Sequence, residues 1–205
     1  MTSRAVTFGR YTLLTRAHLA TLETILQRWP AVTVGILEHL ESPVHAELHL
    51  SHAEKWAAHE EFYQMCTKNW APARNPFSAE ERASIWQAAI RASSLADRVR
   101  TRVIPRPELH HAAFNCAFPA DEYDLVFPAP TPACGDFDQA RNATFGELLA
   151  RPVHEVRPPF VTHTTDILRE VAKGRSWEEF LAPGIHRLFL AMNGPERLAR
   201  RMSTF

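Results

Sequence analysis

The chain has 205 residues, in which 23 basic and 23 acidic side chains cancel to a formal net charge of zero. A neutral chain argues against a protein that binds nucleic acid or an anionic membrane by charge alone. With 45% hydrophobic residues it can bury a sizeable core, and its length predicts one domain over residues 1–205. Apart from Lys55, Lys68 and Lys173, all the basic residues are arginines, whose planar donors suit phosphate.

Cysteine usage and hydropathy predict a cytoplasmic protein. The three cysteines lie far apart in sequence, so neither a disulfide framework nor a cysteine zinc site is indicated. The N-terminal apolar run is too short for a signal peptide, and no segment reaches the roughly 20 apolar residues of a membrane span. We therefore expect neither a membrane nor a nucleic acid as a partner.

Residues 5–37 predict a strand, a helix and a second strand. Residues 5–8 are a short apolar run that ends at Gly9, which is typical of a strand entering a turn. Apolar residues recur at helical spacing over 17–28, and residues 32–37 form a second apolar run. This order implies parallel strands joined by a right-handed crossover.

Residues 38–74 interrupt the alternation and predict an insertion. This segment holds five of the eleven histidines, and a capping box at Ser51 predicts a helix to about Cys66. Four of the histidines stand at helical intervals: His45, His49, His52 and His59. That spacing could gather imidazoles around a structural metal, but the segment also alternates with period two. We favour exposed or acceptor-contacting histidines over a metal site.

The alternation of strands and helices resumes after the insertion. A capping box at Ser78 predicts a helix to about Ser93, and residues 100–104 and 123–127 predict strands. Residues 128–160 hold six of the fifteen prolines, which predicts a segment that is mostly loop. The pair His110 and His111 has no partner at a useful spacing and is interpreted as a loop feature.

The C-terminal part predicts helices over 164–171, from a capping box at Ser176, and over 185–192. Strands that alternate with helices and give way to helices predict an α/β fold. We expect a doubly wound, Rossmann-like parallel sheet with helices on both faces and a helical C-terminus.

The turn after the first strand concentrates groups that suit phosphate. In an open parallel sheet, ligands bind outside the carboxyl ends of the strands. A helix N-terminus at that edge offers unpaired N–H groups and a positive dipole end. Arg10, Thr15, Arg16 and His18 add side-chain donors in the same segment. Neither a P-loop nor the glycine pattern of dinucleotide-binding folds is present.

Three blocks of this sequence resemble one family. Residues 8–18 resemble the GRFxPxHxGH signature of the nucleotidyltransferase superfamily, whose hallmark is (H/T)xGH, with Thr15 in the first place and Ala17 where Gly is usual. Residues 75–82 are similar to the NPF block of archaeal-type nicotinamide mononucleotide adenylyltransferases, and residues 162–183 to their ISGTxIR ending. The chain thus resembles a divergent paralogue of that archaeal type.

The resemblance implies nucleotidyl transfer, in which an acceptor oxygen attacks the α-phosphorus of a nucleoside triphosphate and pyrophosphate leaves. It implies Mg²⁺ as cofactor, bridging triphosphate oxygens, with no metal site built by the protein. The implied catalytic residues are His18, Thr15, Arg10 and Arg169. The implied nucleotide-binding residues are Gly9, Tyr11, Arg16, Thr162, Thr164 and Thr165. The implied acceptor-binding residues are Asn75, Phe77, Ser78 and Phe114.

The departures from the family pattern gather where the acceptor would bind. Residues 38–74 replace a short loop, Phe114 stands near the place of a stacking Trp, and residues 128–130 replace a Ser-Asn pair. In the C-terminal block Leu168 takes the place of the family arginine and Arg169 follows one position late. One helical position turns a side chain by about 100°.

We therefore predict an enzyme that transfers AMP or CMP from its triphosphate to a small phosphate or phosphonate acceptor, for example a cytidylyltransferase of specialised metabolism. The alternative is a nicotinamide mononucleotide adenylyltransferase that makes NAD. A second alternative is a nucleotide-binding module without catalysis, which Thr15, Ala17 and the shifted Arg169 favour. A homo-oligomer is compatible with the resemblance, whereas the base and the acceptor stay open.

Overall fold

The computed structural model describes residues 3–38, 75–131, 135–162, 167, 170, 176 and 178–202. The predicted insertion after Glu38, with its histidines and its capping box, lies outside the described residues. So does most of the predicted helix over 164–171. Three implied site residues fall in that part of the chain: Thr164, Thr165 and Arg169.

Five parallel strands form the sheet of the described chain, in the order β3-β2-β1-β4-β5. The strands are β1 (Arg4–Gly9), β2 (Val32–Leu37), β3 (Val99–Ile104), β4 (Tyr123–Pro128) and β5 (Val153–Val156). The predicted strands over 5–8, 32–37, 100–104 and 123–127 are confirmed. The doubly wound, Rossmann-like sheet is confirmed as well.

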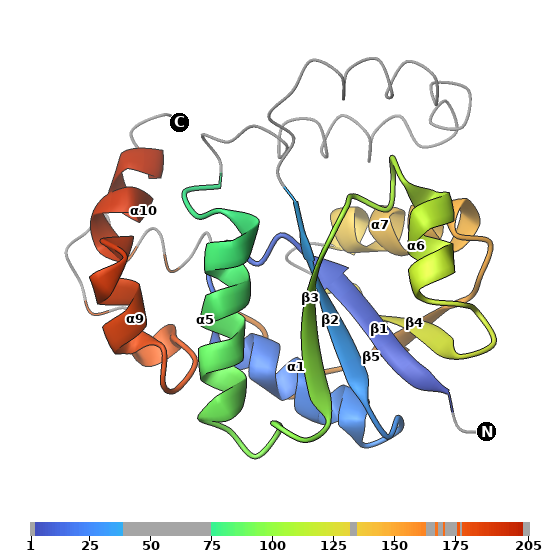
Figure 1. Ribbon diagram of the computed structural model, residues 1–205, viewed down its shortest axis with the longest axis horizontal. Coiled ribbons are helices and arrows are strands. Elements are labelled where there is room, and N and C mark those ends of the chain that lie inside the picture. Colours follow the sequence, from blue (N-terminus) through green and yellow to red (C-terminus); the bar gives the residue numbers. More distant parts are fainter. Residues whose placement is uncertain are drawn as a thin grey trace.

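Helices cover both faces of this sheet (Figure 1). They are α1 (Arg16–Leu26), α5 (Ala79–Arg91), α6 (His111–Ala117), α7 (Gly135–Leu148), α9 (His186–Ala191) and α10 (Gly194–Met202), with a 3₁₀ turn η3 at Glu178–Phe180. In Figure 1, α5, α9 and α10 lie on one side of the sheet, and α6 and α7 lie on the other. The last elements of the described chain are helices, as the sequence predicts.

Strand β1 is buried on both faces because it lies in the middle of the sheet. Successive side chains of a strand point to opposite faces. Ala5 belongs to a core that includes residues of α1, α5, α9 and α10. Val6 and Phe8 belong to a second core with residues of α6 and α7. A central parallel strand between two helical layers needs such an apolar run rather than an alternating one.

Helix α5 begins at the capping residue that the sequence indicates, and α1 begins at a capping box that was not predicted. Ser78 is the N-cap of α5, and its side chain and that of Glu81 form a reciprocal capping box. Thr15 is the N-cap of α1, and it pairs in the same way with His18. Each box satisfies N–H groups that the first turn of a helix leaves without partners.

The prediction that residues 128–160 are mostly loop is wrong. They hold helix α7 and strand β5. Helix α7 carries no strong apolar stripe in its sequence, and its ring Phe145 is held by packing against Phe8 and Phe127. Tertiary packing therefore forms a helix that local periodicity does not show.

Three smaller differences concern helix boundaries. The loop interpretation of the pair His110 and His111 is wrong for His111, which begins α6, whereas His110 is the non-helical residue before it. Phe114 anchors this helix in the second core. The predicted capping box at Ser176 leads only to the short 3₁₀ turn η3. The predicted helix over 185–192 is present as α9, and α10 follows it without having been predicted.

The strand order fixes where a ligand can bind. From β1 the chain builds outward to β2 and β3, and then returns to place β4 on the other side of β1. The carboxyl ends of β1 and β4 therefore flank the point where the direction of winding reverses. In open α/β sheets the ligand crevice lies at this switch point.

Candidate active site

The loop that follows β1 is shaped by Gly9 and Tyr11. Tyr11 has a positive φ of 47°, which is uncommon for a residue with a side chain. Its ring lies so close to Gly9 that a Cβ there would come within 3.1 Å of the Tyr11 Cζ atom. Burial raises the pKa of Tyr11 to about 12, and its hydroxyl is hydrogen-bonded to the Thr7 side chain. The loop after β1 therefore packs around the Tyr11 side chain, whose phenol is neutral at physiological pH.

Thr15 and His18 form the capping box that opens α1. The backbone N–H of Thr15 donates to Nδ1 of His18 over 3.1 Å, and the Thr15 hydroxyl oxygen lies 2.9 Å from the same nitrogen. In return the backbone N–H of His18 donates to the Thr15 hydroxyl at 3.4 Å. The imidazole thus fills a position that Glu or Gln usually fills in this motif.

This hydrogen-bond pattern fixes the protonation of His18. Because Nδ1 accepts the Thr15 N–H, it carries no proton, and the neutral ring must hold its proton on Nε2. Burial lowers the pKa of His18 to about 4, so the ring is neutral at physiological pH. His18 therefore offers one N–H donor on the side of the ring away from Thr15.

Two aromatic rings support the imidazole. Tyr11 packs edge-on against His18 with ring centroids 5.4 Å apart, and Trp86 of α5 lies 6.1 Å from it. Tyr11 and Trp86 also contact each other at 4.8 Å. The ring of His18 is thus held by its own helix, by the preceding loop and by a second helix.

A pocket of about 260 Å³ lies at the switch point, with His18 in its wall. Four parts of the chain supply its lining: α1, the end of β4 with the residues after it, α7, and the segment after β5. The lining residues are Ala17, His18, Thr21, Pro128, Thr131, Phe137, Asp138, Arg141, Pro158, Phe160, Val161 and Thr162. This position agrees with the crevice that the strand order defines.

Arg141 and Asp138 bring charge to this pocket from α7. The Arg141 Nη1 donates to Asp138 Oδ1 over 2.9 Å, and its Nη2 donates to the Pro128 carbonyl over 3.0 Å. Asn142 Oδ1 accepts from Nε and Nη2, and the guanidinium lies 4.8 Å from the centre of the Phe127 ring. Arg141 is therefore a cation held in one orientation beside the pocket.

The structure brings some of the implied catalytic and nucleotide residues together. His18 and Thr162 line the pocket, and Thr15 lies fully buried behind His18. Arg10 is in the loop after β1, where its carbonyl accepts a hydrogen bond from Arg82, and it is not among the lining residues. Arg16 is exposed, and its Nε donates to the Leu181 carbonyl at 3.4 Å. Leu181 also forms a β-bridge with Thr15.

The implied acceptor block at residues 75–78 is built into the scaffold. Asn75 is buried, and its Oδ1 accepts from the Thr12 hydroxyl at 3.4 Å. Phe77 is 1% exposed and packs against Phe189 of α9, with ring centroids 5.7 Å apart. Ser78 caps α5. None of the three lines the pocket of the described chain.

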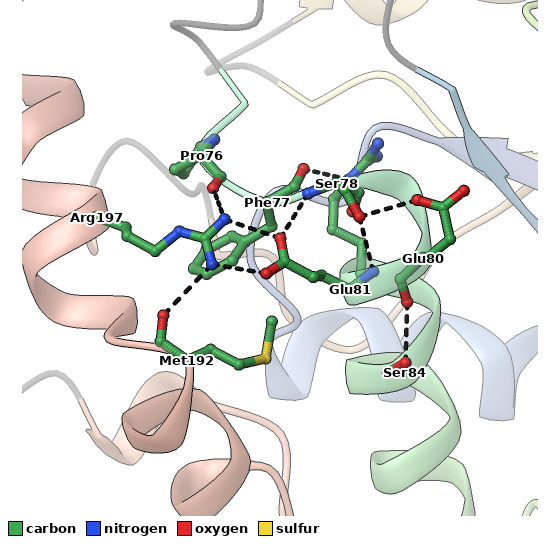
Figure 2. A network of polar contacts seen from close by, with 9 residues as sticks. Pro76, Phe77, Ser78, Glu80, Glu81, Ser84, Met192 and Arg197 are labelled. Carbon is green, nitrogen blue, oxygen red and sulfur yellow. Dashed lines mark hydrogen bonds and ion pairs between the residues drawn. The ribbon is translucent and has the colours of Figure 1, made fainter.

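Arg197 of α10 ties this block to the C-terminal helices, as Figure 2 shows. Its two terminal nitrogens donate to the two carboxylate oxygens of Glu81 at 2.7 and 2.8 Å, and it also bonds the Pro76 carbonyl. The hydrogen bond from Arg197 is the main cause that lowers the pKa of Glu81. The guanidinium lies 4.5 Å from the centre of the Phe77 ring. These contacts join α10 to the start of α5.

Phe114, the remaining implied acceptor residue, is a core residue. It is 3% exposed on α6 and contacts Phe8 and Phe118, with ring centroids 5.2 and 5.0 Å apart. Its ring is buried in the second core and does not line the described pocket.

Sequence reasoning missed the pocket residues that α7 and the segment after β5 contribute. Arg141, Asp138 and Phe160 are the chemically distinctive ones. These residues could have been identified only after α7 and β5 had been predicted. The residues that follow β4 and β5 would then be expected at the carboxyl ends of the strands, where ligands bind in such sheets. Neither element was predicted, because the prolines of residues 128–160 indicated a loop.

No group of three His, Cys, Asp or Glu side chains among the described residues is placed to hold a metal ion. None of the helices within the described ranges is long and apolar enough to cross a membrane.

No protein-family model and no curated protein sequence matches the chain. Solved structures do. A bifunctional NMN adenylyltransferase/ADP ribose pyrophosphatase from Francisella tularensis, complexed with AMP and a manganese ion, is similar at a TM-score of 0.59 and 14% identity. The match covers 99% of this chain, which spans about half, 52%, of that protein.

Two shorter proteins match over nearly their full length. The nicotinic acid mononucleotide adenylyltransferase of Plasmodium falciparum, complexed with NaAD, is similar at a TM-score of 0.57 and 10% identity, over 96% of this chain and 98% of that one. A Vibrio parahaemolyticus protein described as a nicotinate-nucleotide adenylyltransferase is similar at a TM-score of 0.56 and 14% identity, over 96% of each chain. The chain therefore has the fold of these mononucleotide adenylyltransferases.

Proposed function

We propose that the chain is a nucleotidyltransferase. It transfers a nucleoside monophosphate, AMP or CMP, from a nucleoside triphosphate to a small phosphate or phosphonate acceptor, and it releases pyrophosphate. The observation that carries the proposal is the geometry of His18, whose Nδ1 is occupied by Thr15 and whose ring lines a pocket at the switch point. A fold shared with mononucleotide adenylyltransferases supports the same reading.

The chemistry needs positioning rather than a covalent intermediate. An oxygen of the acceptor forms a bond to the α-phosphorus as the bond from that phosphorus to the pyrophosphate oxygen breaks, in line and on the opposite side. His18 donates its Nε2 proton in a hydrogen bond to a phosphate oxygen that gains charge in the transition state. Thr15 positions the imidazole. The family resemblance assigns neutralisation of the triphosphate to Arg10, which is in the loop after β1 and outside the pocket lining, and to Arg169, which lies outside the described residues.

The pocket fits a metal that arrives with its triphosphate. Mg²⁺ keeps several waters and is held in proteins by one or two carboxylates together with substrate phosphates. Asp138 is the carboxylate among the described lining residues, and it is the group that would face such an ion. When bound, Mg²⁺ would neutralise charge on the phosphate oxygens.

The two proposed enzyme activities differ in their acceptor. The structural neighbours favour nicotinamide or nicotinate mononucleotide as the acceptor, with AMP as the transferred group. Against this, Phe114 is packed in the core and residues 75–78 serve the scaffold. None of these residues lines the described pocket, and this observation supports an acceptor other than those two mononucleotides.

A screen for pyrophosphate release tests the proposal. Each of ATP, CTP, GTP and UTP is incubated with Mg²⁺ and with nicotinamide mononucleotide, nicotinate mononucleotide, and a panel of small phosphates and phosphonates. We expect release with one triphosphate and a small phosphate or phosphonate. Release only with the two mononucleotides would establish the alternative. Tight calorimetric binding of a triphosphate without release from any pair would establish the inactive nucleotide-binding module.

A further inference from the structure

Two adjacent apolar side chains at the pocket are unusually exposed. Phe160 is 48% exposed and Val161 is 46% exposed. Among the described residues, the other large hydrophobic side chain with comparable exposure is Leu190 of α9, at 47%, which does not line the pocket. Exposed apolar side chains that gather at a pocket indicate a ligand surface more often than isolated ones do.

The pocket is lined by two chemically different sets of residues, one apolar and one polar or charged. Phe160 and Val161 stand with Pro158 and Phe137 as its apolar residues, along with Ala17 and Pro128. His18, Asp138 and Arg141 provide polar and charged groups, together with three threonines. Phosphates require residues of the second set, whereas the flat face of a nucleobase is satisfied by an aromatic ring.

We propose that Phe160 is the residue on which the nucleobase stacks, and that Val161 extends this apolar surface. The inference rests on the proposed function and deepens it, since it assigns part of the pocket to one part of the nucleotide. Every base has a π-face, so stacking on Phe160 supplies affinity without selecting the base. Selection of adenine or cytosine is then left to polar groups at the edge of the ring.

A stacking role for Phe160 predicts which kinetic constant its loss would change. The base is remote from the bonds that form and break, so stacking contributes equally to the bound triphosphate and to the transition state. Loss of such uniform binding raises KM for the triphosphate and leaves kcat nearly unchanged. A residue that instead shaped the reacting phosphates would lower kcat.

The experiment compares three variants with the wild-type chain. Phe160→Ala removes the ring, Phe160→Trp keeps an aromatic face, and Leu190→Ala is a matched control that removes an equally exposed apolar side chain away from the pocket. Calorimetry measures binding of ATP and CTP with Mg²⁺, and inorganic tripolyphosphate serves as a probe that lacks a base.

We expect Phe160→Ala to weaken binding of the preferred triphosphate by about 5- to 150-fold, which is the range that loss of one base–aromatic stacking contact produces. Tripolyphosphate binding should not change, Phe160→Trp should restore triphosphate affinity, and Leu190→Ala should match the wild type. Unchanged triphosphate binding in Phe160→Ala overturns the stacking role alone. Equal losses for triphosphate and tripolyphosphate overturn it too, because they indicate a collapsed pocket. A wild-type chain that binds neither ATP nor CTP overturns the proposed function and this inference together.

Discussion

His18 combines two tasks that are usually separate, since it caps a helix and faces a candidate ligand pocket. Its Nδ1 accepts the Thr15 N–H, as a Glu or Gln oxygen does in a common capping box. The same hydrogen bond leaves the proton on Nε2. Helix capping therefore sets the tautomer on which the proposed chemistry depends.

A pair of substitutions separates the two tasks of His18. In His18→Gln the amide oxygen can take over the cap, so we expect the free energy of unfolding to stay within about 0.5 kcal/mol of the wild type. In His18→Ala the cap acceptor is lost, and we expect a loss of about 1 kcal/mol. Urea unfolding measures both. Equal stabilities of the two variants would contradict the capping role.

The lowered pKa of His18 predicts how stability depends on pH. An unfolded histidine takes up a proton near pH 6.5, whereas burial delays uptake in the folded chain to about pH 4. Between these values the unfolded state binds more protons, so the free energy of unfolding falls as pH falls. The loss attributable to this group is at most about 3 kcal/mol, and it is absent above pH 7.

Urea unfolding of wild type and His18→Gln from pH 7.5 to 4.5 checks this prediction. The wild type should lose more stability across the window than the variant, because only the wild type carries the imidazole. Parallel curves for the two proteins would show that the pKa of His18 is not lowered in the fold.

At the scale of elements, Arg82 joins three parts of the scaffold beneath the site. It is 1% exposed on α5, and its guanidinium donates to the carbonyls of Phe77 and Ser78 at 3.3 and 3.2 Å and of Leu37 at 2.7 Å. It also bonds the carbonyl of Arg10 in the loop after β1. One side chain thus fixes the start of α5 to the ends of β1 and β2.

Replacing Arg82 by Lys keeps the charge but removes the planar set of donors. An ammonium group cannot reach all of these carbonyls, so buried acceptors lose their partners. We expect Arg82→Lys to lower the free energy of unfolding by about 2–4 kcal/mol in urea titrations. Arg91→Lys, on an exposed position of the same helix, is the control and should change stability by less than about 0.5 kcal/mol. A similar, small effect at both positions would refute the scaffold role of Arg82.

The elements that the sequence predicts are those with a strong local signal. Strand β2 is apolar except for Thr33, α1 has apolar residues at helical spacing, and α5 begins at a capping box whose two residues are three positions apart in sequence. Helix α7 begins with Gly135 and includes Thr144 and Asn142, which are weak helix formers. Its stability comes from packing against strands that are distant in sequence, so the local sequence pattern does not predict this helix.

At the scale of the whole molecule, the order of the strands determines which parts of the chain can meet at the site. The place of His18 at this edge of the sheet was predictable because it is in the first turn of the helix that follows β1, and β1 and α1 are both recognisable in the sequence. Arg141 and Phe160 were not, because they reach the pocket only through α7 and β5. The burial of Phe77 against Phe189 of α9 was not predictable for a related reason, since it depends on the packing of the C-terminal helices.

The central claim is that His18 donates to a phosphate during nucleotidyl transfer, and one comparison tests it most directly. Pyrophosphate release is measured for the wild type and for His18→Ala, which carries no side-chain donor, with the triphosphate and acceptor that the screen identifies and with folding verified by circular dichroism. Loss of one transition-state donor is expected to lower kcat by about 100- to 1000-fold in His18→Ala. Wild-type turnover by a folded His18→Ala variant would contradict the claim.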